Sequence, residues 1–167
     1  AWSSEIIYFL NQQRSLLALQ KAEKMKKQAF ADRYPYGIFS CIRTMGHIYK
    51  SRGNFDLSAQ YYQEALDYML KNMPDQDPSQ LYSSLAEYYR NTQKDYATAL
   101  DYCEKALKSA KTERNIAQAM IEKCLVLFRQ GRIDEFNDCY KEAVQMADRC
   151  KLSASVSLLI AHISKEF

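Results

Sequence analysis

One pattern of small and large residues recurs three times along this chain, and it constrains the fold more than any other feature. In each copy a small residue is flanked by large ones, a turn follows, and a second motif again alternates small and large residues. The small residue of the first motif is Gly46, then Ala86, then Cys124. The first two of these are 40 residues apart and the last two 38 apart. A recurrence of this size predicts a repeat array in which each copy is one supersecondary unit.

Turns divide the chain into segments of helical length, and scarce glycine and proline favour helices over strands. The sequence has four glycines and three prolines among 167 residues. Gly53 and Gly131 can adopt a positive φ angle and end a helix. Asp77 followed by Pro78 is typical of a helix start, because proline lacks the N–H group that the first helical turn leaves unbonded. Further turns are expected at residues 34–37, 72–79 and 91–95.

The three copies share their spacing residue by residue. The first reads Ile42-x-x-Met45-Gly46-x-x-Tyr49 and, after a turn, Ser58-x-x-x-Tyr62-x-x-Ala65. The second reads Tyr82-x-x-Leu85-Ala86-x-x-Tyr89, then Ala99-x-x-x-Cys103-x-x-Ala106. The third reads Met120-x-x-Lys123-Cys124-x-x-Leu127, then Phe136-x-x-x-Tyr140-x-x-Ala143. This pattern resembles the tetratricopeptide repeat. The resemblance implies an all-α fold, a right-handed superhelical array of antiparallel helix pairs, with small residues where two backbones approach closely.

The resemblance covers nearly the whole chain. It implies a partial repeat at about residues 3–34, full repeats at about 38–72, 78–111 and 115–150, and the first helix of a further repeat at 152–167. The intervals exceed the usual period of about 34 residues, so we expect additional residues in the linker around 74–79 and one more in the turn at 91–95. Because Ile163 and Phe167 are apolar, the last helix lacks the polar face that closes an array. We therefore expect this chain to be a fragment of a longer protein.

No catalytic or cofactor motif is present, so the sequence predicts a segment that is not an enzyme and holds no cofactor. Both a glycine-rich phosphate loop and an HExxH metal motif are missing. The five cysteines form no CxxC pair, which argues against a zinc or redox site. The 23 basic and 20 acidic residues are interspersed, so we expect no direct contact with nucleic acid. No apolar stretch is long enough to predict a membrane span.

The predicted binding surface lies on the first helices of the repeats, which line the concave side of such an array and suit a peptide or a partner helix. On these first helices, positions one and two turns apart that lie next to the motif residues, which form the packing stripe, should face a ligand. These positions hold Arg43, His47 and Lys50, then Ser83, Glu87 and Arg90, then Ile121, Leu125 and Phe128. The surface would grade from basic to apolar, which fits a peptide with an acidic and a hydrophobic part. Two alternatives stay open: the basic set is merely solvated, or the apolar set is core because the third repeat is shifted.

Together these features predict a non-catalytic scaffold that binds a protein or peptide. The long, tyrosine-rich repeats are similar to arrays in bacterial signalling proteins that precede histidine kinase or DNA-binding output modules, which implies a sensory or regulatory segment. The alternative is a free-standing adaptor that assembles a protein complex. We also expect self-association through the open helix at 152–167. Scattered single cysteines behave as small hydrophobes and favour a cytoplasmic location, with an extracytoplasmic sensor segment as the alternative.

Overall fold

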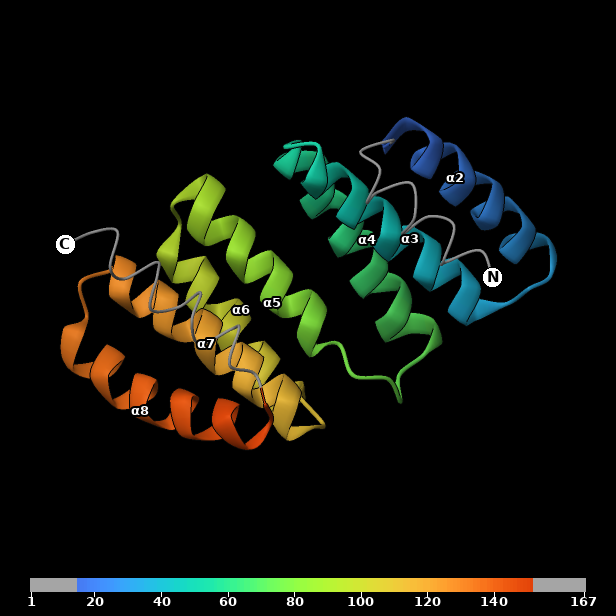
Figure 1. Cartoon of the computed structure of the whole chain (residues 1–167). Coiled ribbons are helices and arrows are strands. Elements are labelled where there is room, and N and C mark those ends of the chain that lie inside the picture. Colours follow the sequence, from blue (N-terminus) through green and yellow to red (C-terminus); the bar gives the residue numbers. More distant parts are fainter. Residues whose placement is uncertain (1–14, 152–167) are drawn as a thin grey trace. The chain divides into compact units, whose positions relative to one another are not determined.

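The computed structural model describes residues 15–151, and the secondary-structure elements in that range are all helical (Figure 1). They are α2 (Ser15–Ala31), α3 (Pro35–Ser51), α4 (Phe55–Asn72), α5 (Ser79–Tyr88), the π-helical η1 (Tyr89–Gln93), α6 (Tyr96–Ser109), α7 (Glu113–Arg129) and α8 (Ile133–Arg149). The predicted all-α class, built as a repeat array of helix pairs, is confirmed. The helices predicted before residue 15 and at 152–167 lie outside the described residues.

The chain divides between Gln76 and Asp77 into two compact units. In the first unit, α3 packs against both α2 and α4. In the second unit, α5 packs against α6, α6 against α7, and α7 against α8, while α5 also contacts α7. Each unit therefore contains at least one helix pair of the kind that the repeated motif predicts.

Glycine and asparagine set the turns at which helices end and begin. Gly53 has a φ of +75° and Gly131 a φ of +72°, a backbone conformation in which a side chain would be strained. These two glycines follow α3 and α7, as the sequence predicted. Asn54 then begins α4, because its side-chain oxygen accepts the backbone N–H of Leu57 at 3.2 Å. Local turn chemistry thus fixes the helix boundaries.

Asp77 fixes the start of α5 and joins it to the loop before α7. One carboxylate oxygen accepts the backbone N–H of Ser79 at 2.9 Å. The other accepts the backbone N–H of Lys111 and the side-chain amide of Asn115, each at 2.8 Å. Burial alone would raise the pKa of Asp77, but the hydrogen bonds from these three residues outweigh it and lower the pKa. Asp77 therefore marks the start of α5, as the sequence predicted, and also makes a tertiary contact within the second unit.

At Gly46, α3 packs tightly against a side chain of α4. A Cβ atom placed on this glycine would lie 2.7 Å from Cδ1 and Cε1 of Tyr62. The Ser58 hydroxyl, also on α4, donates to the carbonyl oxygen of Gly46 at 2.8 Å. Tyr62 is 3% exposed, so its ring fills the gap beside the glycine. This is the packing of small against large residues that the spacing predicted.

The second helix pair contains one residue more than the other two. In each pair, the small motif residue of the first helix has a motif partner on the second helix. The spacing is 16 residues in the first and third pairs (Gly46–Tyr62 and Cys124–Tyr140) and 17 in the second (Ala86–Cys103). The structure places the additional residue in η1, where the chain winds with the wider π-helical turn. Lys94 follows with a φ of +57° and ends the segment. The expected turn at 91–95 is thus partly helical.

Candidate functional site

The first candidate surface is the α3 face, which we define as Arg43, His47 and Lys50. These residues lie one and two turns apart on α3, so they share one side of the helix. His47 is exposed, and Arg43 and Lys50 are half-buried. The intervening Met45 and Gly46 are buried. The three side chains that the sequence singled out in the first repeat therefore lie together at the surface of the first unit.

Contacts within the first unit orient two side chains of the α3 face. The Arg43 guanidinium lies over the Phe39 ring, 5.3 Å from its centroid, which is a cation–π contact. The Tyr62 hydroxyl is 2.9 Å from His47 Nδ1, and the two rings meet edge to face with centroids 5.3 Å apart. When the phenol donates to Nδ1, the neutral imidazole carries its proton on Nε2. The face thus combines a guanidinium and an imidazole in defined positions.

Arg90 does not extend a basic surface, and the prediction is wrong for this residue. It is 3% exposed, and its Nε and Nη2 donate to the two carboxylate oxygens of Glu122 at 2.7 and 3.2 Å. Its Nη1 donates to the side-chain oxygen of Asn91 at 2.7 Å. Arg90 lies within η1, where the spacing of an α-helix no longer holds. Ser83 and Glu87 are half-buried and one turn apart on α5.

The apolar set on α7 belongs mainly to the core of the second unit. Ile121 and Leu125 are each 8% exposed and are members of one hydrophobic cluster. Phe128 is partly buried against this cluster, and its ring centroid is 5.5 Å from that of Phe136 on α8. Of the two interpretations that the sequence left open, core burial is therefore the one that holds for Ile121 and Leu125. Ile121 and Leu125 are therefore not available to line a groove, whereas Phe128 keeps part of its ring exposed.

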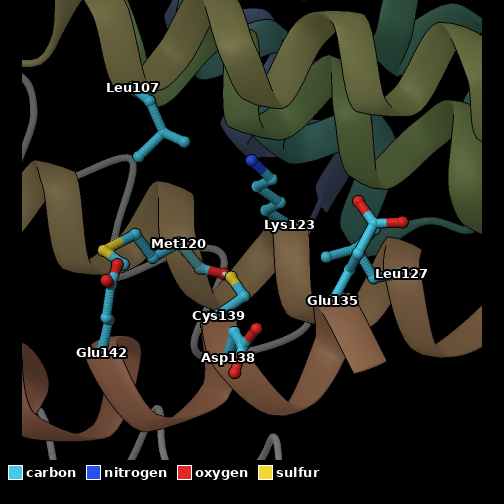
Figure 2. A pocket seen from close by; sticks show the side chains of 8 residues that line it. All are labelled: Leu107, Met120, Lys123, Leu127, Glu135, Asp138, Cys139 and Glu142. Atoms are coloured by element: carbon cyan, nitrogen blue, oxygen red, sulfur yellow. Dashed lines mark hydrogen bonds between the residues drawn. The ribbon is translucent and has the colours of Figure 1, made fainter. Parts of the chain in front are cut away.

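The second unit contains a pocket that the sequence analysis missed (Figure 2). It has a volume of about 450 Å³ and lies between α6, α7 and α8. Figure 2 shows the eight side chains that line it, with one from α6, three from α7 and four from α8. They are Leu107, Met120, Lys123, Leu127, Glu135, Asp138, Cys139 and Glu142. The lining thus joins an apolar base to a charged rim.

A comparison among the helix pairs explains why this space is open. In the first two pairs, a tyrosine of the first helix stacks on a tyrosine of the second, with ring centroids 5.3 and 5.4 Å apart; these are Tyr49–Tyr61 and Tyr89–Tyr102. The equivalent positions of the third pair hold Leu127 and Cys139, which both line the pocket. Two smaller side chains replace a pair of stacked rings. The signal was present in the sequence, at the motif position of Leu127 and at the position of Cys139 beside the motif.

Ion pairs shape the rim of the pocket. Lys123 Nζ lies 2.5 Å from Glu104 Oε1. Burial alone would lower the pKa of Lys123, but its hydrogen bond and charge interaction with Glu104 outweigh that effect and raise it. Arg132 donates to both carboxylate oxygens of Glu135, at 2.6 and 2.5 Å, and this lowers the pKa of Glu135. The remaining carboxylates of the rim are those of Asp138 and Glu142.

The segment that contains the first two helix pairs matches a known family model. Residues 38–112 match the family model of the tetratricopeptide repeat. The match supports a tetratricopeptide-repeat family. No curated protein matches the sequence. Tetratricopeptide repeats in general mediate protein–protein interaction and are non-catalytic. The α3 face lies within the matched segment.

The third helix pair lies beyond the tetratricopeptide-repeat match, yet it repeats the motif. Its small residue, Cys124, is buried on α7, and Ala143 is buried on α8. Across residues 15–151, no group of three or more histidine, cysteine, aspartate or glutamate side chains is arranged to hold a metal ion. None of the helices in that range combines the length and the apolar composition that a bilayer span requires.

The first unit also has a hollow on its α4 side, of about 690 Å³. Its lining is mostly polar and comes from the end of α2, from α3 and from α4: Phe30, Ile42, Gln60, Gln63, Glu64, Asp67, Tyr68, Lys71 and Asn72. An ion pair between Lys26 and Glu64, at 3.1 Å, links α2 to α4 nearby. The lining includes no arrangement of nucleophile and base. Its polar side chains are those of a solvated surface.

Proposed function

We propose that this chain is a non-catalytic scaffold that binds a protein or peptide partner, and that the α3 face carries the contact. The observation that carries the proposal is the placement of Arg43, His47 and Lys50 on one side of a first helix. They lie beside the packing stripe rather than on it, within the segment that matches tetratricopeptide repeats. The family's general role in protein–protein interaction supports this use of the surface.

The chemistry of the α3 face fits an acidic segment of a partner. A guanidinium donates paired hydrogen bonds to a carboxylate, and the cation–π contact with Phe39 holds that of Arg43 in place. Arg90 is paired with Glu122, and Leu125 lies in the core. The partner segment that fits the α3 face is therefore an acidic stretch, for which Leu125 provides no apolar anchor.

For the protein as a whole, we propose a sensory or regulatory segment of a larger bacterial signalling protein, of the histidine kinase or transcriptional regulator type. The support is the similarity of its long, tyrosine-rich repeats to arrays of that kind. The alternative is a free-standing adaptor for the assembly of a protein complex. The sequence that flanks this chain in its gene distinguishes the two: a kinase or a helix-turn-helix module favours the first. Self-association through 152–167 concerns residues outside the described range.

The test is a binding measurement with the double variant Arg43→Glu and Lys50→Glu. The probe is the partner that the parent chain recovers from its source cell, with the affinity measured at several salt concentrations. Exposed ion pairs contribute about 0–1 kcal/mol each, so the two reversals should weaken binding by about tenfold. The salt dependence should also become flatter, because fewer charges meet in the complex.

The matched control is Lys24→Glu with Lys27→Glu. It makes the same change in net charge on α2, where both lysines are exposed, and it should leave the affinity unchanged. Circular dichroism should show that both double variants keep the helical fold. Equal weakening by both would mean that only net charge matters. Undiminished binding by the α3 variant would refute the assignment of the contact to this face.

A further inference from the structure

Two cysteines of the third helix pair, one on α7 and one on α8, have their sulfur atoms close together. The sulfur atoms of Cys124 and Cys139 are 3.0 Å apart, about 1 Å more than the length of a disulfide bond. Cys124 is fully buried on α7. Cys139 is half-buried on α8 and lines the pocket shown in Figure 2. One thiol therefore lies beside an open pocket, and the other lies directly behind it.

The two thiols differ in acidity because their surroundings differ. The Cys124 thiol donates a hydrogen bond to Cys139, which lowers the pKa of Cys139. Burial and the carboxylates of Glu142 and Glu104 oppose this change, but with the added charge of Lys123 the pKa of Cys139 stays lowered. The same hydrogen bond, together with burial, raises the pKa of Cys124. Cys139 also lies 3.6 Å from the backbone carbonyl of Met120. The more exposed thiol is thus the one that ionises first, and the thiolate is the nucleophilic form.

We propose that Cys139 and Cys124 form an oxidation-sensitive pair, in which a hydroperoxide oxidises Cys139 and Cys124 then closes a disulfide. The absence of a CxxC spacing had argued against a redox site, but that criterion detects only cysteines that are close in sequence. Here two antiparallel helices bring together residues that are 15 apart. The close approach at a small-residue position of the motif is what places the sulfur atoms in reach.

The chemistry balances with hydrogen peroxide as the oxidant. The Cys139 thiolate attacks one peroxide oxygen, the O–O bond breaks, and hydroxide leaves and takes up a proton to form water. Cys139 then carries a sulfenic acid. The Cys124 sulfur gives up its proton and attacks the Cys139 sulfur, the S–O bond breaks, and hydroxide leaves with that proton as a second water. Two electrons pass from the thiol pair to the peroxide, and one S–S bond forms.

The other three cysteines provide internal controls. Cys41 and Cys103 are buried, and burial raises the pKa of each thiol, so neither should react readily. Cys150 is half-buried at the end of α8. Cys124 and Cys139 are the cysteine pair whose sulfur atoms come within hydrogen-bonding distance in residues 15–151. Selective reaction of this pair is therefore the expected result.

The experiment treats the reduced chain with hydrogen peroxide, alkylates the remaining thiols and identifies cross-links by mass spectrometry after trypsin digestion. Cleavage after Lys123 and Arg129 releases a peptide that contains Cys124, and cleavage after Arg132 and Lys141 releases one that contains Cys139. These two peptides should appear linked to each other and separate on reduction. Cys139 should lose its reactivity toward the alkylating agent at least about tenfold faster than Cys41.

Two variants separate the steps. Cys139→Ser should abolish the cross-link. Cys124→Ala, which copies Ala86 of the second pair, should leave Cys139 as a sulfenic acid that dimedone traps. The matched control, Cys41→Ser, should form the cross-link at the parent's rate. Links from Cys139 to Cys103 or Cys150, equal oxidation rates for the five thiols, or a linked pair that forms only in urea would each overturn the proposal.

Discussion

Gly46→Ala tests whether the absence of a side chain sets the contact between α3 and α4. The new Cβ atom would lie 2.7 Å from Cδ1 and Cε1 of Tyr62 and 3.3 Å from its Cζ, whereas carbon atoms in contact prefer about 3.5–4.0 Å. The Tyr62 ring cannot rotate away without losing packing contacts and a hydrogen bond, because it is buried and its hydroxyl is bonded to His47. The helices must therefore separate slightly, or the ring must leave its position.

Two opposing effects determine the magnitude. Replacing glycine by alanine inside a helix stabilises it by about 0.8–1 kcal/mol. Forcing an additional methyl group into a packed interface costs about 1–3 kcal/mol. Because the contact is with a rigid ring that is buried and held by a hydrogen bond, overpacking should outweigh the helical gain. We expect Gly46→Ala to lower the free energy of unfolding by about 1 kcal/mol.

The assay is urea unfolding followed by circular dichroism, in the parent and in a Tyr62→Cys background. The second pair supplies the comparison, since Ala86 and Cys103 occupy the equivalent positions there and lie in one core cluster. With the ring removed, Gly46→Ala should stabilise the chain by about 0.8–1 kcal/mol. If Gly46→Ala stabilises the parent by that full amount, the steric argument is refuted.

Three further results are expected from stability measurements. Ala106→Phe should overpack the fully buried position of Ala106 and cost about 1–3 kcal/mol, whereas Lys27→Ala on the exposed side of α2 should change the free energy of unfolding by less than about 0.5 kcal/mol; equal melting shifts would contradict this. Glu122→Ala leaves the buried guanidinium of Arg90 without its carboxylate and should cost about 3–5 kcal/mol, so a loss below about 1 kcal/mol in urea unfolding would argue against the pair. Folding lowers the pKa of Asp77 below its ordinary value of 3.8. The ionised carboxylate therefore stabilises the folded state above pH 3.8, and this stabilisation is lost as the pH falls through the lower pKa of the folded state. The stability advantage of the parent over Asp77→Asn should therefore shrink below about pH 4 in acid titrations of unfolding, and an advantage that stays constant with pH would show that the charge is not what matters.

The helix pairs could be predicted from sequence because each motif residue has a local or nearest-neighbour role. Gly53 and Gly131 end helices through their own backbone conformation, and a small residue such as Gly46 is recognisable from its large partner 16 positions later. Such features need no knowledge of distant contacts. They made the all-α class and the turns predictable.

The binding surface was less predictable, because counting one and two turns assumes an unbroken α-helix. The count reached Arg90 just inside the π-helical segment, and no sequence rule indicated that Glu122 would meet it there. For Leu125, an apolar side chain suits both a hydrophobic core and a binding groove, so residue type could not distinguish the two. The pocket arises because Leu127 and Cys139 stand where the first two pairs have stacked tyrosines. A comparison of the three copies at the motif position of Leu127 and at the position of Cys139 beside it would have revealed this difference.

The π-helical turn at Tyr89–Gln93 also indicates how a helix pair of this kind can change length. Inserting a residue into an ordinary helix rotates all that follows by about 100° and moves the packing stripe off its partner. In η1 the additional residue is confined to one widened turn, and α6 still places Ala99, Cys103 and Ala106 in the interior. Deleting one residue from this turn should therefore be tolerated, since it restores the 16-residue spacing of the other pairs. The same deletion within α3 or α7 should unfold its unit. Insertions and deletions in such arrays need not be sought in the loops alone.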